Sequence, residues 1–310
     1  MGTTDGADGD AGGRGGYGRP GWCRSEDGVG LACTDFGGTG PDLVLVHATG
    51  FCAAVLGPLA RGLVGSFHCY GVDLRGHGRS ERPPDGNFDW AGFALDVTAV
   101  IDHYGLDRPL AFGHSAGGTA VLLAEEDHPG TFAGIYAYEP VMFPSDVPLE
   151  PQFEGNPLAV AARRRRETFP SSDEAFANFA SKPPLDSIDP DVLLAYVENG
   201  FETVPAGDGG DGSTVRLRCR RDDEAAIFTL ALDHPGYARL GNVRCPVTLA
   251  CGALTDSFGR TTMRRAADRL ARSTVSVIDG LGHFGPLERP GTIAEAVTEA
   301  LLTPRPASPS

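Results

Sequence analysis

Short apolar runs that alternate with segments of helical length are the strongest constraint on how this chain folds. The runs are DLVLVH at 42–47, FHCYGVDLRG, LAFGHS, FAGIYAYE, VTLACG and TVSVIDG, each rich in β-branched or aromatic residues. Continuous apolar runs of this length are typical of strands covered on both faces. Helical spacing occurs at 90–104, 116–128, 261–272 and 291–302. This alternation predicts βαβ units, and so an α/β fold with a mostly parallel sheet flanked by helices.

The alternation is interrupted once and is preceded by a different pattern. From Trp22 the sequence reads WCRS, an Asp-Gly turn signal and then VGLACTDFG, which predicts a β-hairpin. Between 140 and 244 the strand signal gives way to helical, Pro-rich and charged sequence, which we interpret as an inserted cap with a flexible loop at 206–213. We therefore expect a core of residues 21–139 and 245–303, a disordered leader at 1–20 and a disordered tail at 304–310.

Charge and composition restrict the possible partners. The formal net charge of −15 disfavours nucleic acid or an anionic membrane as a partner. The seven cysteines form no zinc-like pair, and no histidine pairs with a second ligand at metal-like spacing, so we expect neither a metal nor another cofactor. Without a signal-like segment or a long apolar stretch, the sequence predicts a cytoplasmic protein that acts on a small molecule.

The motif Gly113-His114-Ser115-Ala116-Gly117 follows an apolar run and precedes a helical segment. This G-x-S-x-G pattern is typical of a sharp strand-to-helix turn that exposes a nucleophilic serine, and small residues around it allow close packing. Ser115 is therefore the predicted nucleophile, and the N–H of Ala116 is the predicted oxyanion donor. A Gly-rich turn with a capping serine is the structural alternative.

Four motifs in order give the chain a resemblance to the α/β-hydrolase superfamily over about residues 22 to 302. They are VHATGF, VDLRGHGRSERP, GHSAGG and a late GxxxD followed by GHF. The resemblance implies an eight-stranded, mostly parallel sheet whose first strands are antiparallel, with a helical cap inserted after the sixth strand. The chain departs from the common family pattern at His47-Ala48, where many members have His-Gly.

The same resemblance implies the partners of the serine. It places the catalytic base at His283, in a loop before the final helical segment, and the acid at Asp256, after the run VTLAC. Glu139, after the sixth strand, is the alternative acid, because some members carry the acid there. A second oxyanion N–H is expected from the loop after the third strand, at Thr49, with Gly50 as the adjacent candidate.

These residues predict a serine hydrolase that acts on a small ester, thioester or lactone through a Ser-His-Asp triad and an acyl-enzyme. Alternatives on the same triad are hydrolysis of a carbon–carbon bond and cofactor-free perhydrolysis, and a non-catalytic ligand-binding protein also stays open. Haloalkane dehalogenation and epoxide opening are disfavoured, because family members with those activities use an aspartate where this chain has Ser115. Oligomeric state is open.

The cap carries two further features. The arginine run 163–166 is interpreted as a solvated helix face. We expect a few of the cap's aromatic residues to line a pocket above Ser115; these residues are Phe143, Phe153, Phe169, Phe176, Phe179, Tyr196, Phe201 and Phe228.

Overall fold

The computed structural model describes residues 18–143, 156–205 and 212–303. Its central sheet has eight strands in the order β1-β2-β4-β3-β5-β6-β10-β11. β1 and β4 both pair antiparallel with β2, and every other neighbouring pair is parallel, so the predicted sheet is confirmed. The strands are β1 (Arg19–Arg24), β2 (Gly30–Gly38), β3 (Asp42–Val46), β4 (His68–Val72), β5 (Leu110–His114), β6 (Gly134–Tyr138), β10 (Val247–Gly252) and β11 (Ser273–Ile278).

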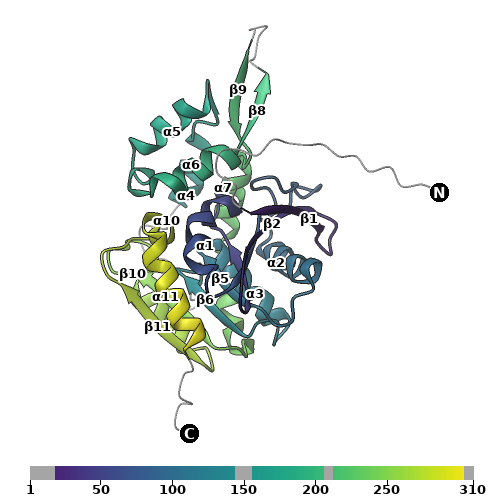
Figure 1. Ribbon diagram of the computed structural model, residues 1–310, viewed down its shortest axis with the longest axis vertical. Helices are drawn as coiled ribbons and strands as arrows, with labels where there is room; N and C mark the ends of the chain where they lie inside the picture. The colour runs from purple at the N-terminus through teal and green to yellow at the C-terminus, as the bar shows by residue number, and fades with distance from the viewer. Residues whose placement is uncertain (1–17, 144–155, 206–211, 304–310) are drawn as a thin grey trace, which may run out of the picture.

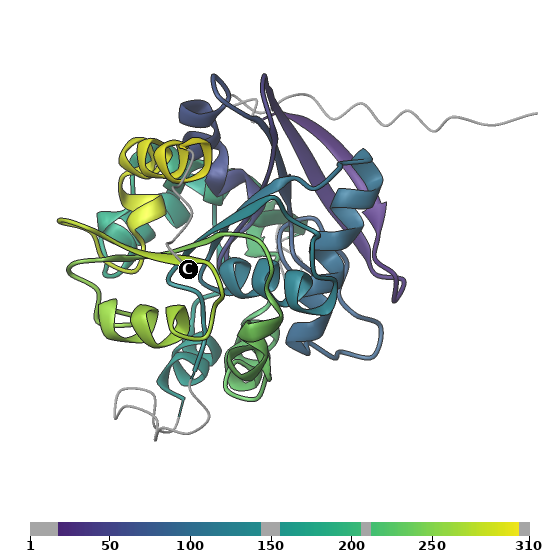
Figure 2. The same cartoon turned by 90° about the horizontal axis from the view of Figure 1, so that it is seen from below.

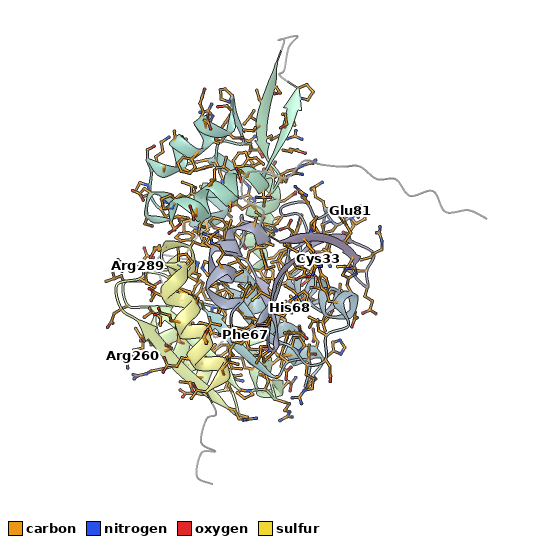
Figure 3. All side chains as sticks on the ribbon, viewed as in Figure 1. Cys33, Phe67, His68, Glu81, Arg260 and Arg289 are labelled. Carbon is orange, nitrogen blue, oxygen red and sulfur yellow. The ribbon has the colours of Figure 1, made fainter. Side chains whose placement is uncertain are left out.

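Helices cover both faces of this sheet (Figures 1 and 2). Successive strand residues point to opposite faces, so Val44 belongs to one buried cluster and Leu45 to another. Apolar side chains of α2, α3 and α9 complete the first cluster, and those of α1 and α11 complete the second. Figure 3 shows the outcome, with Phe67 buried and charged side chains such as Arg260 exposed. These helices are α1 (Gly57–Leu63), α2 (Trp90–Tyr104), α3 (Ala116–Asp127), α9 (Arg260–Ala267) and α11 (Pro290–Leu302).

Local signals explain where α2 begins and ends. The Asp89 side chain accepts a hydrogen bond from the N–H of Ala91, which caps the first turn. Gly105 ends the helix at φ 64°, a left-handed conformation that glycine adopts without strain. The predicted span 90–104 is therefore confirmed, whereas α9 ends at Ala267, five residues before the predicted end at 272.

Helices α4 to α6 and strands β8 and β9, from the segment between β6 and β10, stand beyond one end of the sheet strands (Figure 1), whereas the last part of this segment packs against α3. The segment contains helices, as predicted, and also a three-stranded antiparallel sheet in the order β7-β9-β8 that the sequence analysis missed. These strands are short and carry charged residues such as Glu202 and Arg216, so they lack the apolar run by which the other strands were found. The elements are α4 (Pro157–Arg164), β7 (Thr168–Phe169), α5 (Ser172–Ala180), α6 (Pro190–Asn199), β8 (Phe201–Pro205), β9 (Ser213–Leu217), α7 (Arg221–Leu230) and α8 (Gly236–Arg239).

The N-terminal hairpin begins earlier than expected, because Arg19 and Pro20 already pair with β2. Residues 1–17 of the predicted leader, most of the loop at 206–213, Phe153 and the predicted tail lie outside the described residues. All seven cysteines are free thiols. Within the described part of the chain, no helix is long and apolar enough to cross a membrane.

His234 connects the inserted segment to α2 and is held as a neutral ring. Its ring stacks on Trp90 with centroids 4.9 Å apart. Nε2–H donates to the Val141 carbonyl at 2.9 Å, and Nδ1 accepts from the N–H of Gly236 at 3.3 Å. Burial lowers the pKa of His234 to about 4, because a proton on Nδ1 would be poorly solvated there.

This arrangement predicts a loss of stability in acid. Between pH 6.5 and pH 4 the unfolded chain binds a proton at His234 that the folded chain does not, so stability falls as the pH falls. Between pH 7 and pH 5, the free energy of unfolding of the His234→Gln variant should fall by roughly 1–2 kcal/mol less than that of the wild type. Urea unfolding at the two pH values measures this difference. His128→Gln, at an exposed position, is the control and should match the wild type. Equal pH dependence of all three proteins would contradict the prediction.

Candidate active site

Ser115 occupies the junction between β5 and α3. Its backbone has φ 53° and ψ −116°, which a non-glycine residue adopts only under strain. The Ser115 N–H donates to the Tyr138 carbonyl at 2.9 Å, which ties the turn to the end of β6. Such strain persists only where surrounding contacts enforce it, and it is characteristic of functional sites.

Two glycines make this turn sterically possible. A Cβ at Gly117 would lie 2.3 Å from the Val46 carbonyl oxygen, and one at Gly113 would lie 2.4 Å from the carbonyl oxygen of Gly117. The first turn of α3 therefore packs directly on the backbone at the end of β3. The small residues of the predicted motif are required by this close packing.

His283 lies in the loop after β11 and is fastened to the ends of β5 and β6. Its carbonyl accepts from Nε2–H of His114 at 2.9 Å, and the Tyr138 hydroxyl donates to the carbonyl of Gly282 at 2.7 Å. The His283 Nδ1 is 2.7 Å from Oε2 of Glu139. Because the carboxylate accepts this bond, Nδ1 carries the proton and Nε2 is the nitrogen that can receive one.

Glu139 is held from several sides. It directly follows β6, is fully buried and has φ 45°. Besides His283, its carboxylate accepts from the N–H of Gly252 at 3.0 Å, the hydroxyl of Thr255 at 2.8 Å and the N–H of Phe258 at 3.4 Å. These bonds compensate for the burial of a charged group and fix its orientation toward His283.

The preference for Asp256 as the partner of His283 is corrected by this geometry. Asp256 follows β10 as expected, but it is exposed and its carboxylate accepts a hydrogen bond from the hydroxyl of Ser257 at 3.2 Å. The loop turns the preceding residue, Thr255, inward onto Glu139 instead. The carboxylate on His283 is therefore that of the alternative acid, Glu139.

The loop after β3 forms a turn in which the N–H of Phe51 donates to the Ala48 carbonyl at 3.2 Å. Gly50 has φ 83° at the third position of this turn, where positive φ is needed. The N–H of Gly50 faces the Cys219 thiol, and among the described residues the Thr49 N–H has no hydrogen-bond partner. The N–H of Ala116, at the first position of α3, has no intrahelical acceptor.

The ring of His47 holds the start of this turn through two hydrogen bonds. Its Nε2 accepts from the N–H of Leu74 at 3.0 Å, and its Nδ1–H donates to the Ala48 carbonyl at 2.8 Å. Burial lowers the pKa of His47 to about 4, so the ring is neutral near pH 7 and makes both bonds. The ring thereby links the ends of β3 and β4.

Aromatic rings surround His283. The ring of Phe284 lies 5.3 Å from that of His283, and the ring of Phe258 lies 5.9 Å from it. Phe51 contacts both Phe284, at 6.0 Å, and Tyr196 of the inserted segment, at 5.1 Å. This apolar wall suits an organic substrate. Tyr196 and Phe143, both from the inserted segment, join it, and the ring of Phe143 lies 5.4 Å from that of Phe258.

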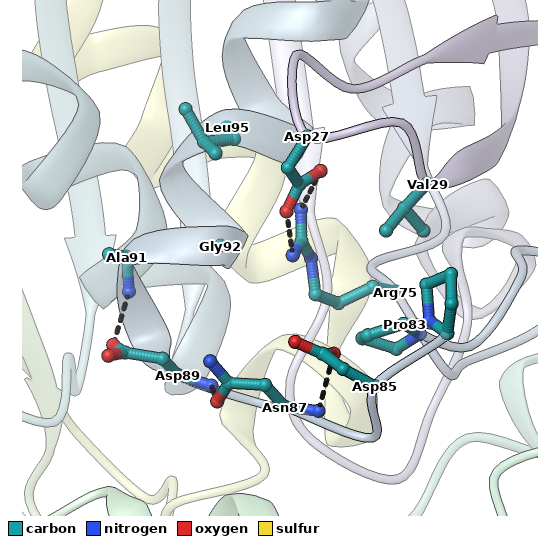
Figure 4. Close-up of a pocket in the computed structure, with 11 residues that line it drawn as sticks. Asp27, Val29, Arg75, Pro83, Asp85, Asn87, Asp89, Ala91, Gly92 and Leu95 are labelled. Atoms are coloured by element: carbon teal, nitrogen blue, oxygen red, sulfur yellow. Dashed lines mark hydrogen bonds and ion pairs between the residues drawn. The ribbon is translucent and has the colours of Figure 1, made fainter.

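The motif after β4 contributes ion pairs to the fold. Arg75 is buried and donates to the carboxylates of Asp96 and Asp27. The Arg75–Asp27 pair lines a cavity of about 430 Å³ at the start of α2 (Figure 4). In the same cavity, Asp85 and Asp89 accept from backbone N–H groups, as capping residues do. No cluster of three or more His, Cys, Asp or Glu that could hold a metal occurs in the described residues.

Comparison with known proteins agrees with this architecture. A profile of the alpha/beta hydrolase family matches residues 43–296, so the chain belongs to that family. The solved structure of E-2-(acetamidomethylene)succinate hydrolase superimposes with a TM-score of 0.76, at 21% identity, over 91% of this chain and 99% of that one.

Similarity to curated proteins is more local. Esterase YbfF of Escherichia coli (strain K12) is 39% identical over 80 residues, which is 26% of this chain and 31% of the esterase. The chain thus aligns with about a third of that relative. Putative carbamate hydrolase RutD of Caulobacter sp. (strain K31) is 25% identical over 269 residues, 84% of this chain and 90% of that protein. These relatives are hydrolases, which supports a hydrolase here.

The close packing of α3 on β3 predicts that Gly117→Ala is destabilising. The added methyl group would meet backbone atoms that cannot rotate away, so we expect the free energy of unfolding to fall by about 1–3 kcal/mol. The matched control is Gly291→Ala in α11, where a Cβ meets nothing within 4 Å and where alanine should be neutral or stabilising. Thermal unfolding of both variants checks this, and an unchanged midpoint for Gly117→Ala would contradict it.

Proposed function

We propose that this protein is a serine hydrolase that cleaves small carboxylic esters, thioesters or lactones through Ser115, His283 and Glu139. The observation that carries the proposal is the 2.7 Å contact between Nδ1 of His283 and Glu139, in a loop bonded to the residue before Ser115. A serine hydroxyl is a weak nucleophile and needs such an oriented base. The earlier expectation of an aspartate as the acid is replaced by a glutamate, and the chemistry stays the same.

In the proposed reaction, Nε2 of His283 takes the hydroxyl proton of Ser115 while Oγ attacks the substrate carbonyl. Glu139 stabilises the resulting imidazolium without accepting its proton. The N–H groups of Ala116 and Thr49 donate to the developing oxyanion, and the start of α3 adds a favourable field. His283 then protonates the leaving group and activates the water that hydrolyses the acyl-enzyme. The rings of Phe51, Phe258 and Phe284 supply the apolar surface for the substrate.

A second candidate function is hydrolysis of an acyl carbon–nitrogen bond. The relative with the longest of the alignments described above is the putative carbamate hydrolase, which supports this candidate. The same residues would serve, because protonation of the leaving group by His283 suits an amine as well as an alcohol. A panel of p-nitrophenyl esters, matched amides and carbamates would rank the two functions by kcat/KM.

Replacing Ser115 with Ala should abolish ester turnover, because the variant lacks the atom that becomes acylated. Labelling by a fluorophosphonate probe should also disappear, while the thermal unfolding midpoint should shift little. Peptide mapping of the labelled wild type identifies the modified residue. Full activity of the Ser115→Ala variant, or labelling at another residue, would overturn the proposal.

The two carboxylates should differ sharply when each is made an amide. Glu139→Gln removes the acceptor that orients His283 and should lower kcat by roughly 10³–10⁴-fold. Asp256→Asn changes an exposed side chain and should alter kcat by less than about threefold. Steady-state kinetics on one p-nitrophenyl ester compares the variants, and a larger loss in Asp256→Asn would return the acid role to that residue.

A further inference from the structure

Arg165 differs from the other arginines of the run 163–166 in being largely buried and paired. Arg163, Arg164 and Arg166 are exposed, as expected for a solvated face, but the side chain of Arg165 is only 18% exposed. Its Nη1 donates to both oxygens of Glu224, at 2.7 and 2.6 Å, and its Nη2 donates to the Tyr196 hydroxyl at 2.5 Å. The expectation of a solvated helix face is therefore wrong for Arg165.

This ion pair lies directly on the turn after β3. A Cβ at Gly50 would be 2.6 Å from Oε1 of Glu224 and 3.2 Å from Nη1 of Arg165. The neighbouring Phe51 packs against Tyr196, which Arg165 also contacts. The inserted segment thus contacts Gly50 and Phe51, the two residues that follow Thr49.

We propose that the Arg165–Glu224 pair is a positioning device that holds the turn 48–51 so that the Thr49 N–H points at the oxyanion. This inference rests on the proposed function. A buried ion pair is a poor source of stability, because desolvation offsets the attraction between the charges. A guanidinium that donates to both a carboxylate and a hydroxyl is fixed in orientation, however, and an oxyanion donor is effective only when it is held in place before the reaction.

A second ion pair provides a matched control. Arg82, after β4, donates to both oxygens of Asp223, the residue next to Glu224 in α7. It joins the inserted segment to the core in the same way, with side-chain exposures of 40% for Arg82 and 7% for Asp223. Arg82 and Asp223 are not among the atoms nearest to Gly50. Loss of this pair should therefore loosen the inserted segment without disturbing the turn.

The test compares two double variants, Arg165→Met with Glu224→Gln and Arg82→Met with Asp223→Asn. Removing both charges together avoids leaving one buried charge without its partner. For the first variant we expect kcat on a p-nitrophenyl ester to fall roughly 10–100-fold, with KM changed less than about threefold. Fluorophosphonate inactivation, which also needs the oxyanion donors, should slow in parallel. The control variant should stay within about threefold of the wild type in all three quantities.

Two further measurements separate positioning from folding. Arg165→Lys keeps the charge but lacks a second nitrogen placed to bind Tyr196 while the first binds Glu224, so its kcat should lie between those of the wild type and the double variant. Amide hydrogen exchange across residues 48–53 should rise in the Arg165/Glu224 variant and not in the control, and this readout does not depend on catalysis.

The outcomes are distinct. Unchanged kcat and unchanged exchange in the folded Arg165/Glu224 variant would overturn the inference while leaving the serine mechanism intact. A raised KM with unchanged kcat would make the pair a substrate contact and also overturn it. A wild-type protein that neither turns over esters nor reacts with the probe would defeat the proposed function. Unchanged exchange across residues 48–53 in the Arg165/Glu224 variant would then defeat the positioning as well.

Discussion

The passage of the backbone from β5 into α3 through the single residue Ser115 is the constraint on which the rest of the site depends. The turn is strained, with φ 53°, and it exists because α3 approaches the end of β3 closely enough to exclude any side chain at Gly117. The same approach brings the first N–H groups of α3 beside the loop after β3. The strained turn at Ser115 and the position of the Ala116 N–H are therefore consequences of one packing contact, and a change to that contact alters both.

The parallel sheet explains why groups far apart in the chain meet here. The carboxyl ends of β3, β5, β6 and β10 lie at one edge of the sheet, so residues that follow these strands become neighbours. Glu139 leaves β6 with φ 45° and so turns its carboxylate toward the loop after β10. There the N–H of Gly252 and the hydroxyl of Thr255 receive it. The acid is thus oriented by its own backbone and by the loop that carries Asp256.

Sequence reasoning reached the strands and helices because buried parallel strands leave continuous apolar runs and the segments between them have helical length and spacing. It found Ser115 from a motif whose glycines the turn requires, and His283 from the resemblance to the α/β-hydrolase superfamily. It favoured Asp256 over Glu139 as the partner of His283, whereas the structure places Glu139 beside that ring. Both residues follow a strand at the same edge, and only the direction of each side chain separates them. The strands β7, β8 and β9 were missed because side chains such as Glu202 and Arg216 pair with each other at the surface instead of entering a core.

Arg165 shows a further limit of sequence reasoning. Four consecutive arginines have the same chemistry, and no local pattern says which of them points inward. Burial of one guanidinium is tolerable only where a carboxylate is within reach, and Glu224 supplies it from 59 positions away. The partner therefore becomes visible only when α7 is placed beside the end of α4. Since that pair rests on Gly50, the inserted segment contributes to the geometry of the site through contacts with the backbone of the turn, in addition to the aromatic surface of Tyr196.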